Sequence, residues 1–253
     1  TGYGEAGVSN PTQASLAAEG QLAQDMPTIT PRPTQAELPM VISANDGLVL
    51  QATYYSAPAR PAPAVLLLHQ RGRDRTTWDA LALRLQATGY AVLTVDQRGH
   101  GETGGAEDWS LAQEDARDAL ALLSELPGVA PGQIVVIGAS IGANLGLNAC
   151  AGLPGCAAAV LLSPGLDYRG ITTAGAMAQL GARPVLIVAS EGDANNPADS
   201  ITLDSMAAGD HQLIILPDAG HGTDMLGAVP DLGERIVTWL VAHIPPPGPV
   251  PVS

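Results

Sequence analysis

Residues 136–146, VIGASIGANLG, contain a serine in a pattern that supports nucleophilic chemistry. Gly138, Ser140 and Gly142 fit the pattern G-x-S-x-G, in which a serine on a sharp strand-to-helix turn presents its hydroxyl to a carbonyl carbon. The same letters also occur in glycine-rich bends without chemical function. With 29 glycines in 253 residues a chance match is possible, so the flanking elements must decide between the two interpretations.

A serine nucleophile needs a base to take its proton and an acid to orient that base. His221, in LPDAGHGTDML, follows the last apolar run and lies between two glycines, which favours the base over a surface or capping histidine. The acid is expected between nucleophile and base, where SEGDANNP offers Asp193 as first choice and Glu191 as alternative. Asp218 is either a turn residue or a helper to His221.

Attack on a carbonyl also requires backbone N–H donors for the developing oxyanion. Ile141, the residue after the serine, supplies one candidate. The other is expected in LLLHQRGRDRTTW, from Arg71 or, as second choice, from Gln70. The arginines of this stretch are equally typical of an exposed turn.

Strand and helix patterns alternate along most of the chain. A hairpin is predicted in LPMVISANDGLVLQATYY, and buried strands are predicted at 64–68, 91–95, 134–138, 158–163, 185–190 and 212–216. Helices are predicted at 76–88, 110–126, 141–152, 172–180, 198–208 and 231–243, the first two capped by Thr76 and Ser110. This alternation predicts a mostly parallel sheet with helices on both faces.

Ser140 therefore lies between a predicted strand and a predicted helix, at the carboxyl end of the strand. A sharp turn there brings Gly138 and Gly142 together, where larger side chains would collide. This context favours the nucleophile over the simple bend.

The composition predicts a single catalytic domain with two terminal extensions. A chain of 253 residues that is 46% hydrophobic builds one sizeable core. Residues 1–37 are rich in Thr, Gln, Ala, Ser and Pro, which suits a linker behind a processed signal or lipid anchor, or an ordinary terminus. The expected domain spans 38–244, and 245–253 form a Pro-rich tail.

The charge balance excludes several partners. A net charge of −14 argues against nucleic acid and against anionic membrane surfaces. No run approaches the ~20 apolar residues of a membrane-spanning helix. A small-molecule substrate is therefore the expected partner, and the sequence does not indicate an oligomeric state.

The two cysteines, Cys150 and Cys156, are six residues apart in CAGLPGC. A disulfide between them is favoured over two buried free thiols, and it predicts an oxidising, extracytoplasmic location, secreted or at the cell surface.

Taken together, these residues resemble the α/β-hydrolase superfamily from about residue 40 to 243. Within it the chain is similar to small esterases without a cap and to the dienelactone-hydrolase-like group. The matching pieces are LLLHQRG, DQRGHG (96–101), GASIG, ASEGD and AGHGTDML, and their order and spacing make the match specific.

The resemblance implies the α/β-hydrolase fold and a triad of Ser140, Asp193 and His221. It also implies an oxyanion hole formed by the backbone amides of Arg71 and Ile141. Two departures are visible: Gln70 replaces the Gly of a common His-Gly pair, and a Ser replaces the Cys nucleophile of dienelactone hydrolases proper, so their substrate is not carried over. In DQRGHG, Arg98 and His100 are interpreted as structural residues that tie loops together, with the alternative that they line the site.

We therefore expect a serine ester hydrolase that acts on small, short-acyl esters without a metal or an organic cofactor. A peptidase or thioesterase of the same fold is the alternative, followed by a non-catalytic binding protein. Tyr168 and Leu166, in the loop PGLDYRGI, are the expected walls of the substrate pocket.

Overall fold

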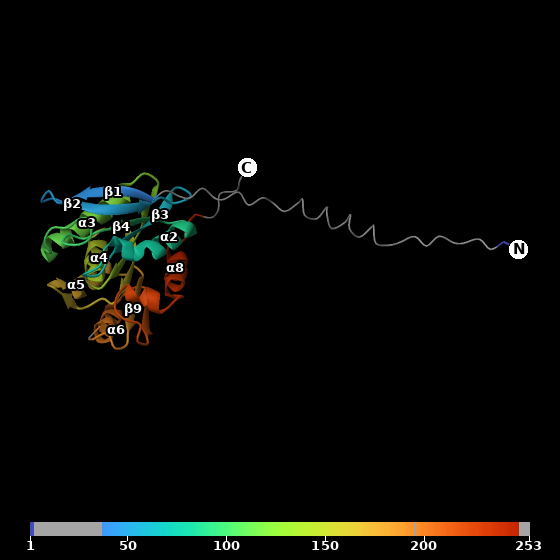
Figure 1. Ribbon diagram of the computed structural model, residues 1–253. Coiled ribbons are helices and arrows are strands. Elements are labelled where there is room, and N and C mark those ends of the chain that lie inside the picture. Colours follow the sequence, from blue (N-terminus) through green and yellow to red (C-terminus); the bar gives the residue numbers. More distant parts are fainter. Residues whose placement is uncertain (3–36, 195, 248–253) are drawn as a thin grey trace. The chain divides into compact units, whose positions relative to one another are not determined.

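The computed structural model describes residues 1–2, 37–194 and 196–247 (Figure 1). The strands are β1 (Glu37–Ser43), β2 (Val49–Tyr55), β3 (Ala62–Leu68), β4 (Ala91–Val95), β5 (Val129–Ala139), β6 (Cys156–Leu162), β7 (Asp167–Tyr168), β8 (Ile171–Thr172), β9 (Val185–Ser190) and β10 (His211–Leu216). The helices are the 3-10 turn η1 (Arg75–Trp78), α2 (Asp79–Thr88), α3 (Trp109–Glu125), α4 (Ile141–Gly152), α5 (Ala174–Leu180), α6 (Asn196–Met206), α7 (Asp224–Ala228) and α8 (Leu232–His243).

One eight-stranded sheet organises the domain, in the order β1-β2-β4-β3-β5-β6-β9-β10. The β1–β2 hairpin is antiparallel and pairs antiparallel with β4, whereas the pairs from β4 to β10 are parallel. The predicted mostly parallel sheet with an N-terminal hairpin is therefore confirmed. Because parallel strands share one carboxyl edge, the loops after β3, β5, β6, β9 and β10 all open at that edge.

Two layers of helices bury the central strands of the sheet, as the continuous apolar runs predict. β3, β4 and β9 are buried along their whole length. Leu66 and Leu68 of β3 belong to the core cluster on the face covered by α3, α4, α5 and α6, whereas the alternate residues Val65 and Leu67 belong to the cluster on the face covered by η1, α2, α7 and α8. The predicted helices on both faces are confirmed.

The first two predicted helical segments each begin one residue earlier than predicted, with the 3-10 turn η1 ahead of α2 and with α3, because aspartates cap them. The Asp74 carboxylate accepts from the Thr76 N–H at 2.9 Å and starts the 3-10 turn η1, so Thr76 is not the capping residue. Asp108 accepts from the Leu111 N–H at 3.0 Å, so α3 begins before Ser110. A carboxylate accepts more strongly than a hydroxyl and suits the positive end of the helix dipole.

The sequence predicts one helix over 172–180, but its first residue, Thr172, belongs to a β-strand instead. Ile171 and Thr172 form β8, and their carbonyls accept hydrogen bonds from the Asn144 and Asn148 side chains of α4, at 2.8 and 2.9 Å. The helix α5 therefore begins only at Ala174. The short helix α7 was not predicted.

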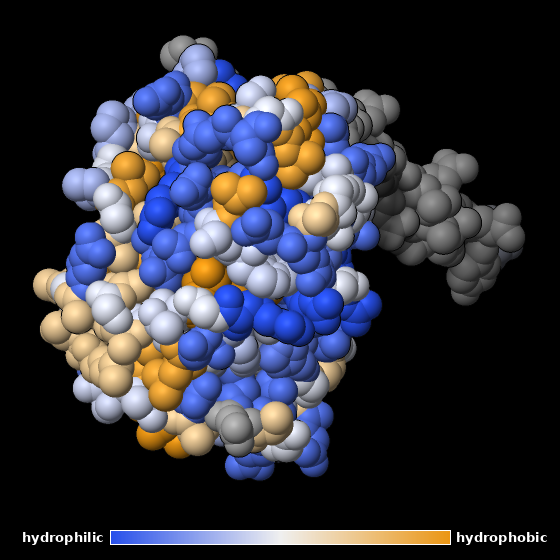
Figure 2. All heavy atoms as spheres, turned by 90° about the vertical axis from the view of Figure 1, so that its left-hand side faces the viewer, coloured by the Kyte–Doolittle hydropathy of each residue, from blue (hydrophilic) through white to orange (hydrophobic). Residues whose placement is uncertain are grey.

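The predicted linker 1–37 and tail 245–253 lie almost wholly outside the described residues, so these domain limits stay predictions. Within the described part of the chain, none of the helices combines the length and the apolar character needed to cross a bilayer. The face in Figure 2 is largely hydrophilic, with scattered hydrophobic residues and one broader, moderately hydrophobic region at its lower left.

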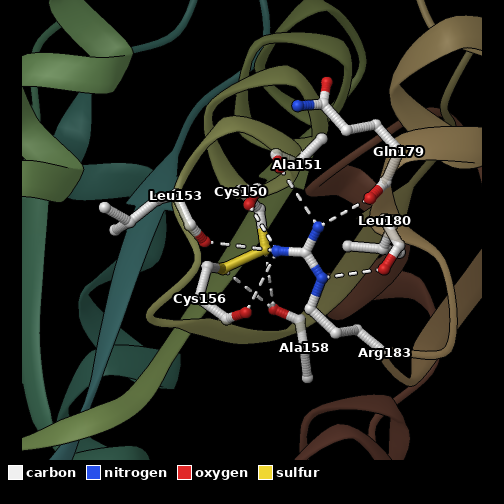
Figure 3. Close-up of a disulfide and its surroundings, with 8 residues drawn as sticks. All are labelled: Cys150, Ala151, Leu153, Cys156, Ala158, Gln179, Leu180 and Arg183. Carbon is white, nitrogen blue, oxygen red and sulfur yellow. Dashed lines mark hydrogen bonds between the residues drawn. A yellow bond between two sulfur atoms is a disulfide. The ribbon is translucent and has the colours of Figure 1, made fainter.

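Cys150 and Cys156 form a disulfide that joins the end of α4 to the start of β6 (Figure 3). The predicted pairing is confirmed. The extracytoplasmic location inferred from it stays a prediction, which cell fractionation would test.

The Arg183 guanidinium lies at the same corner and donates hydrogen bonds to the backbone carbonyls around it (Figure 3). It donates to Cys150 at 2.7 Å and Ala151 at 3.1 Å, at the end of α4, and to Gln179 at 2.9 Å and Leu180 at 2.8 Å, at the end of α5. The last carbonyls of a helix have no partner within it, so one side chain satisfies the ends of two helices.

Replacing Arg183 with Met should therefore lower the free energy of unfolding by about 2–3 kcal/mol, because several carbonyls lose a charged donor. Urea-induced unfolding measures the effect. The matched control is Arg235→Met, since the exposed Arg235 side chain makes no hydrogen bond in the described part of the chain. Equal unfolding midpoints for the two variants would contradict this account.

Candidate active site

Ser140 occupies a strained turn between β5 and α4. Its φ of 54° and ψ of −122° lie in a region that non-glycine residues rarely adopt. Such strain persists only where the surroundings enforce it, and it is concentrated at functional sites. The Ser140 N–H donates to the Leu162 carbonyl at 2.8 Å, which ties the turn to β6.

The two flanking glycines are required by close contacts with backbone atoms. A Cβ atom on Gly138 would overlap the carbonyl oxygen of Gly142, and a Cβ on Gly142 would overlap the carbonyl oxygens of Leu68 and His69. The close approach of Gly138 and Gly142 that the sequence predicts is thus confirmed. The contact at Gly142 also places the start of α4 directly against the end of β3.

Asp193 and His221 meet above the carboxyl edge of the sheet, in the loops after β9 and β10. The His221 Nδ1 lies 2.7 Å from the Asp193 Oδ2. Because a carboxylate only accepts, the ring proton is on Nδ1 and Nε2 is left free to act as a base. Asp193, not Glu191, contacts His221, and the Glu191 residue is exposed. Asp218 is an exposed turn residue with a φ of 38°.

Ser163 is a member of this cluster that the sequence analysis missed. Its buried hydroxyl donates to the Asp193 Oδ2 at 3.1 Å and accepts from the Gly222 N–H at 2.9 Å. It therefore orients the carboxylate and holds the residue after His221. The available signal was a polar residue at the end of the buried strand AAVLLS.

The nucleophile and the base are not hydrogen-bonded in this structure. Within the described residues the Ser140 hydroxyl makes no hydrogen bond. A hydrogen bond therefore links the acid Asp193 to the base His221, but none links His221 to Ser140. Catalytic hydrogen bonds are often long in free enzymes and tighten when substrate binds.

His69 orients the peptide that carries the candidate oxyanion donor. The Gln97 N–H donates to the His69 Nε2 at 3.0 Å, so the ring proton is on Nδ1 and donates to the Gln70 carbonyl at 2.8 Å. The Arg71 N–H lies across the same planar peptide and points the opposite way. Among the described residues neither this N–H nor that of Ile141 has a partner, so both are free to bind an oxyanion.

The arginines of this loop are paired with carboxylates. Arg71 Nε donates to both oxygens of Glu107, at 2.9 and 3.0 Å, and Arg73 donates to Asp224 at 2.7 Å. Both arginine side chains are about half exposed, so these pairs add little stability. This stretch is therefore the exposed turn that the sequence analysis gave as an alternative, and its arginines pair with carboxylates of a neighbouring loop and of α7.

Arg98 and His100 have the structural role that the sequence predicted. Arg98 makes two hydrogen bonds to the buried Asp115, at 2.6 and 2.7 Å, and bonds Asp46 in the hairpin turn. These carboxylates raise the pKa of Arg98 above its usual value. The His100 ring packs edge-on against His69 with centroids 5.2 Å apart.

The expected pocket residues Tyr168 and Leu166 lie in the segment between β6 and α5. The Tyr168 hydroxyl is 3.4 Å from the Ser163 carbonyl, and the Leu166 N–H donates to Asp199 at 3.0 Å. A hollow of about 290 Å³ beside the base is lined by Glu191, Gly192, Asp193, Asp218, Gly220 and His221. Neither Tyr168 nor Leu166 lines it, so their contact with substrate stays a prediction.

This sheet order, with a strained serine between a parallel strand and a helix, defines the α/β-hydrolase fold. Residues 59–189 match the model of the family described as serine aminopeptidase, S33. Because this match covers more than half of the chain, the protein belongs to that family.

Individual proteins are also similar to this chain. The chain is 29% identical to the uncharacterized protein Rv2307c of Mycobacterium tuberculosis over 205 residues, which cover 72% of this chain and 71% of that protein. It is 35% identical to the esterase Rv0045c of the same organism over 94 residues, 37% of this chain and 30% of the esterase. The dienelactone hydrolase of Anabaena variabilis superposes with a TM-score of 0.69 at 20% identity, covering 83% of this chain and 98% of that structure.

Acidification should destabilise the protein through His69. Burial lowers the pKa of His69 from 6.5 to about 4, so the folded state disfavours the protonated ring. The corresponding stability is present above pH 6.5 and is lost as the pH falls toward 4, by about 3 kcal/mol in full. The free energy of unfolding, measured between pH 7 and 4, should fall less steeply in His69→Asn.

The control for this experiment is His211→Asn, which removes an exposed histidine. Its pH dependence should match that of the wild type. If His69→Asn and the wild type lose stability in parallel as the pH falls, the interpretation that His69 is buried in its neutral form is wrong.

Proposed function

We propose that this α/β hydrolase is a serine esterase that cleaves small, short-acyl carboxylic esters through an acyl-enzyme on Ser140. The observation that carries the proposal is the 2.7 Å hydrogen bond between Asp193 and His221, at the same sheet edge as the strained Ser140. In serine hydrolases, an acid that orients a base toward a serine is the arrangement that activates the hydroxyl, and Ser140 is only partly buried.

In the first half-reaction, the Ser140 Oγ attacks the ester carbonyl carbon and its proton passes to His221 Nε2. The carbonyl oxygen becomes an oxyanion that accepts from the Arg71 and Ile141 N–H groups. When the tetrahedral intermediate collapses, the carbon–oxygen bond to the alcohol breaks and His221 donates its proton to the alcohol. Gln70 N–H, the third candidate donor, belongs to the same loop as Arg71.

In the second half-reaction, water attacks the acyl-enzyme and gives its proton to His221. The oxyanion forms again at the same donors, and its collapse releases the acid and returns the proton to Ser140. Asp193 holds the Nδ1–H tautomer throughout and stabilises the imidazolium. No step requires a metal or an organic cofactor.

Peptide hydrolysis is the second candidate, because the family is described as serine aminopeptidase. The hollow beside His221 carries the carboxylates of Glu191 and Asp218, which would attract the ammonium group of a peptide N-terminus. Comparing p-nitrophenyl acetate with an aminoacyl p-nitroanilide separates the candidates, and a kcat/KM higher for the anilide would favour the peptidase.

Ser140→Ala and His221→Ala should each lower kcat by roughly 10⁴-fold or more on a p-nitrophenyl ester, because the two groups act as a unit. The double variant should be hardly slower than either single variant. His211→Ala, at an exposed site remote from Ser140 in the sheet order, is the control and should keep wild-type kcat. Additive losses, or an active Ser140→Ala, would refute the assignment.

The acyl preference follows from how little chain covers the site. Between Ser140 and Asp193 the chain forms α4, β6, α5 and β9, and the segment 164–171, which contains β7 and the start of β8, is the main segment left as cover. Each added methylene of an acyl chain gains ~0.8 kcal/mol only where an apolar wall buries it. The kcat/KM across p-nitrophenyl esters should therefore peak between acetate and butyrate and fall by octanoate.

The series is measured at constant pH with acetate, butyrate, octanoate and decanoate esters. Tyr168→Ala and Leu166→Ala should flatten the preference if these residues form the wall. A maximum at decanoate would show a deep acyl tunnel and would contradict a shallow site.

A further inference from the structure

The Gln70 side chain leaves the oxyanion loop and enters the loop that carries His221. Gln70 is 6% exposed, and its Nε2 donates to the His221 carbonyl at 3.3 Å. Its Oε1 accepts from the Thr223 N–H at 2.6 Å and from the Thr223 hydroxyl at 3.0 Å. One side-chain amide thus bonds the backbone on both sides of Gly222, across 151 to 153 positions of sequence.

The peptide between His221 and Gly222 is consequently held at both ends. Its carbonyl accepts from Gln70, and its N–H donates to the Ser163 hydroxyl at 2.9 Å. Since the imidazole is also held by Asp193, both the backbone and the ring of His221 have assigned partners. A residue held in this way keeps one direction for its Nε2.

Gly222 has a conformation that fits around this amide. Its φ is +58°, and a Cβ atom there would overlap the Gln70 Oε1. The glycine at 222 therefore leaves the space that the Gln70 side chain fills. Gln70 and Gly222 form a complementary pair across the two loops.

The backbone of Gln70 connects the same residue to the oxyanion donor. Its carbonyl accepts from His69, and the adjoining N–H is that of Arg71. The side chain of Gln70 thus contacts the base loop, while its main chain forms part of the peptide that orients the candidate oxyanion donor. A single residue therefore connects the base loop and the oxyanion loop, whose relative positions must be kept during the reaction.

We propose that Gln70 is a positioning residue that fixes the base loop of His221 relative to the oxyanion loop through its side-chain amide. This inference rests on the proposed serine-hydrolase function and extends it to a residue outside the triad. Gln70 acts through His221 and Arg71 and does not itself exchange a proton.

The test compares Gln70→Met with Gln86→Met. Gln86 is also buried and also donates to a backbone carbonyl, that of Ser56 at 3.0 Å, but it lies on α2 and contacts neither loop. We expect Gln70→Met to lower kcat on p-nitrophenyl acetate by about 10- to 100-fold, with KM changed less than about threefold, because a misplaced base slows the chemical step. Gln86→Met should keep wild-type kcat at a similar loss of stability.

A second readout does not depend on turnover. The Nδ1 proton of His221, identified by its absence in His221→Ala, should give a protected downfield NMR signal in the wild type and in Gln86→Met. In Gln70→Met the signal should broaden or disappear. If the wild type cleaves no ester but this signal still depends on Gln70, the proposed esterase function fails while the positioning role stands.

Gln70→Glu provides a second variant in case Gln70→Met does not fold. It keeps an acceptor oxygen for Thr223 but loses the donor to the His221 carbonyl, so its kcat should lie between those of the wild type and Gln70→Met. The proposal is overturned if a folded Gln70 variant keeps kcat within threefold of the wild type and an unchanged Nδ1 signal. It is also overturned if Gln86→Met loses kcat equally.

Discussion

The contact between Gly142 and the carbonyl oxygens of Leu68 and His69 is the constraint on which the site depends. Only a residue without a side chain allows α4 to start this close to the end of β3. The Ile141 N–H, one residue before Gly142, is therefore held near the loop that carries the Arg71 N–H. The strained Ser140 is a consequence of the same turn, because the chain must reverse between β5 and α4 within one residue.

Around this turn, the site is assembled from loops that share one edge of a parallel sheet. Ser163 after β6, Asp193 after β9 and His221 after β10 form one hydrogen-bonded chain that ends in the imidazole. The loop after β3 joins it through Gln70, and the buried, neutral His69 holds that loop through its hydrogen bond to the Gln70 carbonyl. The function thus depends on side chains that bridge loops, while the sheet determines which loops are neighbours.

Much of this architecture could be predicted from the sequence. β4, β9 and α4 have the predicted limits, because continuous apolar runs and the G-x-S-x-G turn are local signals. The capping roles of Asp74 and Asp108 were missed because several polar residues upstream of a helix compete for the same N–H groups. Ser163 and the Gln70 side chain were missed for another reason: their partners lie 30 to 153 positions away, and only the folded chain brings them together.

The most direct test of this account is covalent labelling of the native protein with a fluorophosphonate, followed by peptide mass spectrometry. Such a reagent reacts with a serine that a neighbouring base has activated. The account predicts a single adduct on Ser140 that forms much more slowly when His221 or Asp193 is replaced. An unlabelled Ser140 in folded wild-type protein, or labelling that is indifferent to His221, would contradict it.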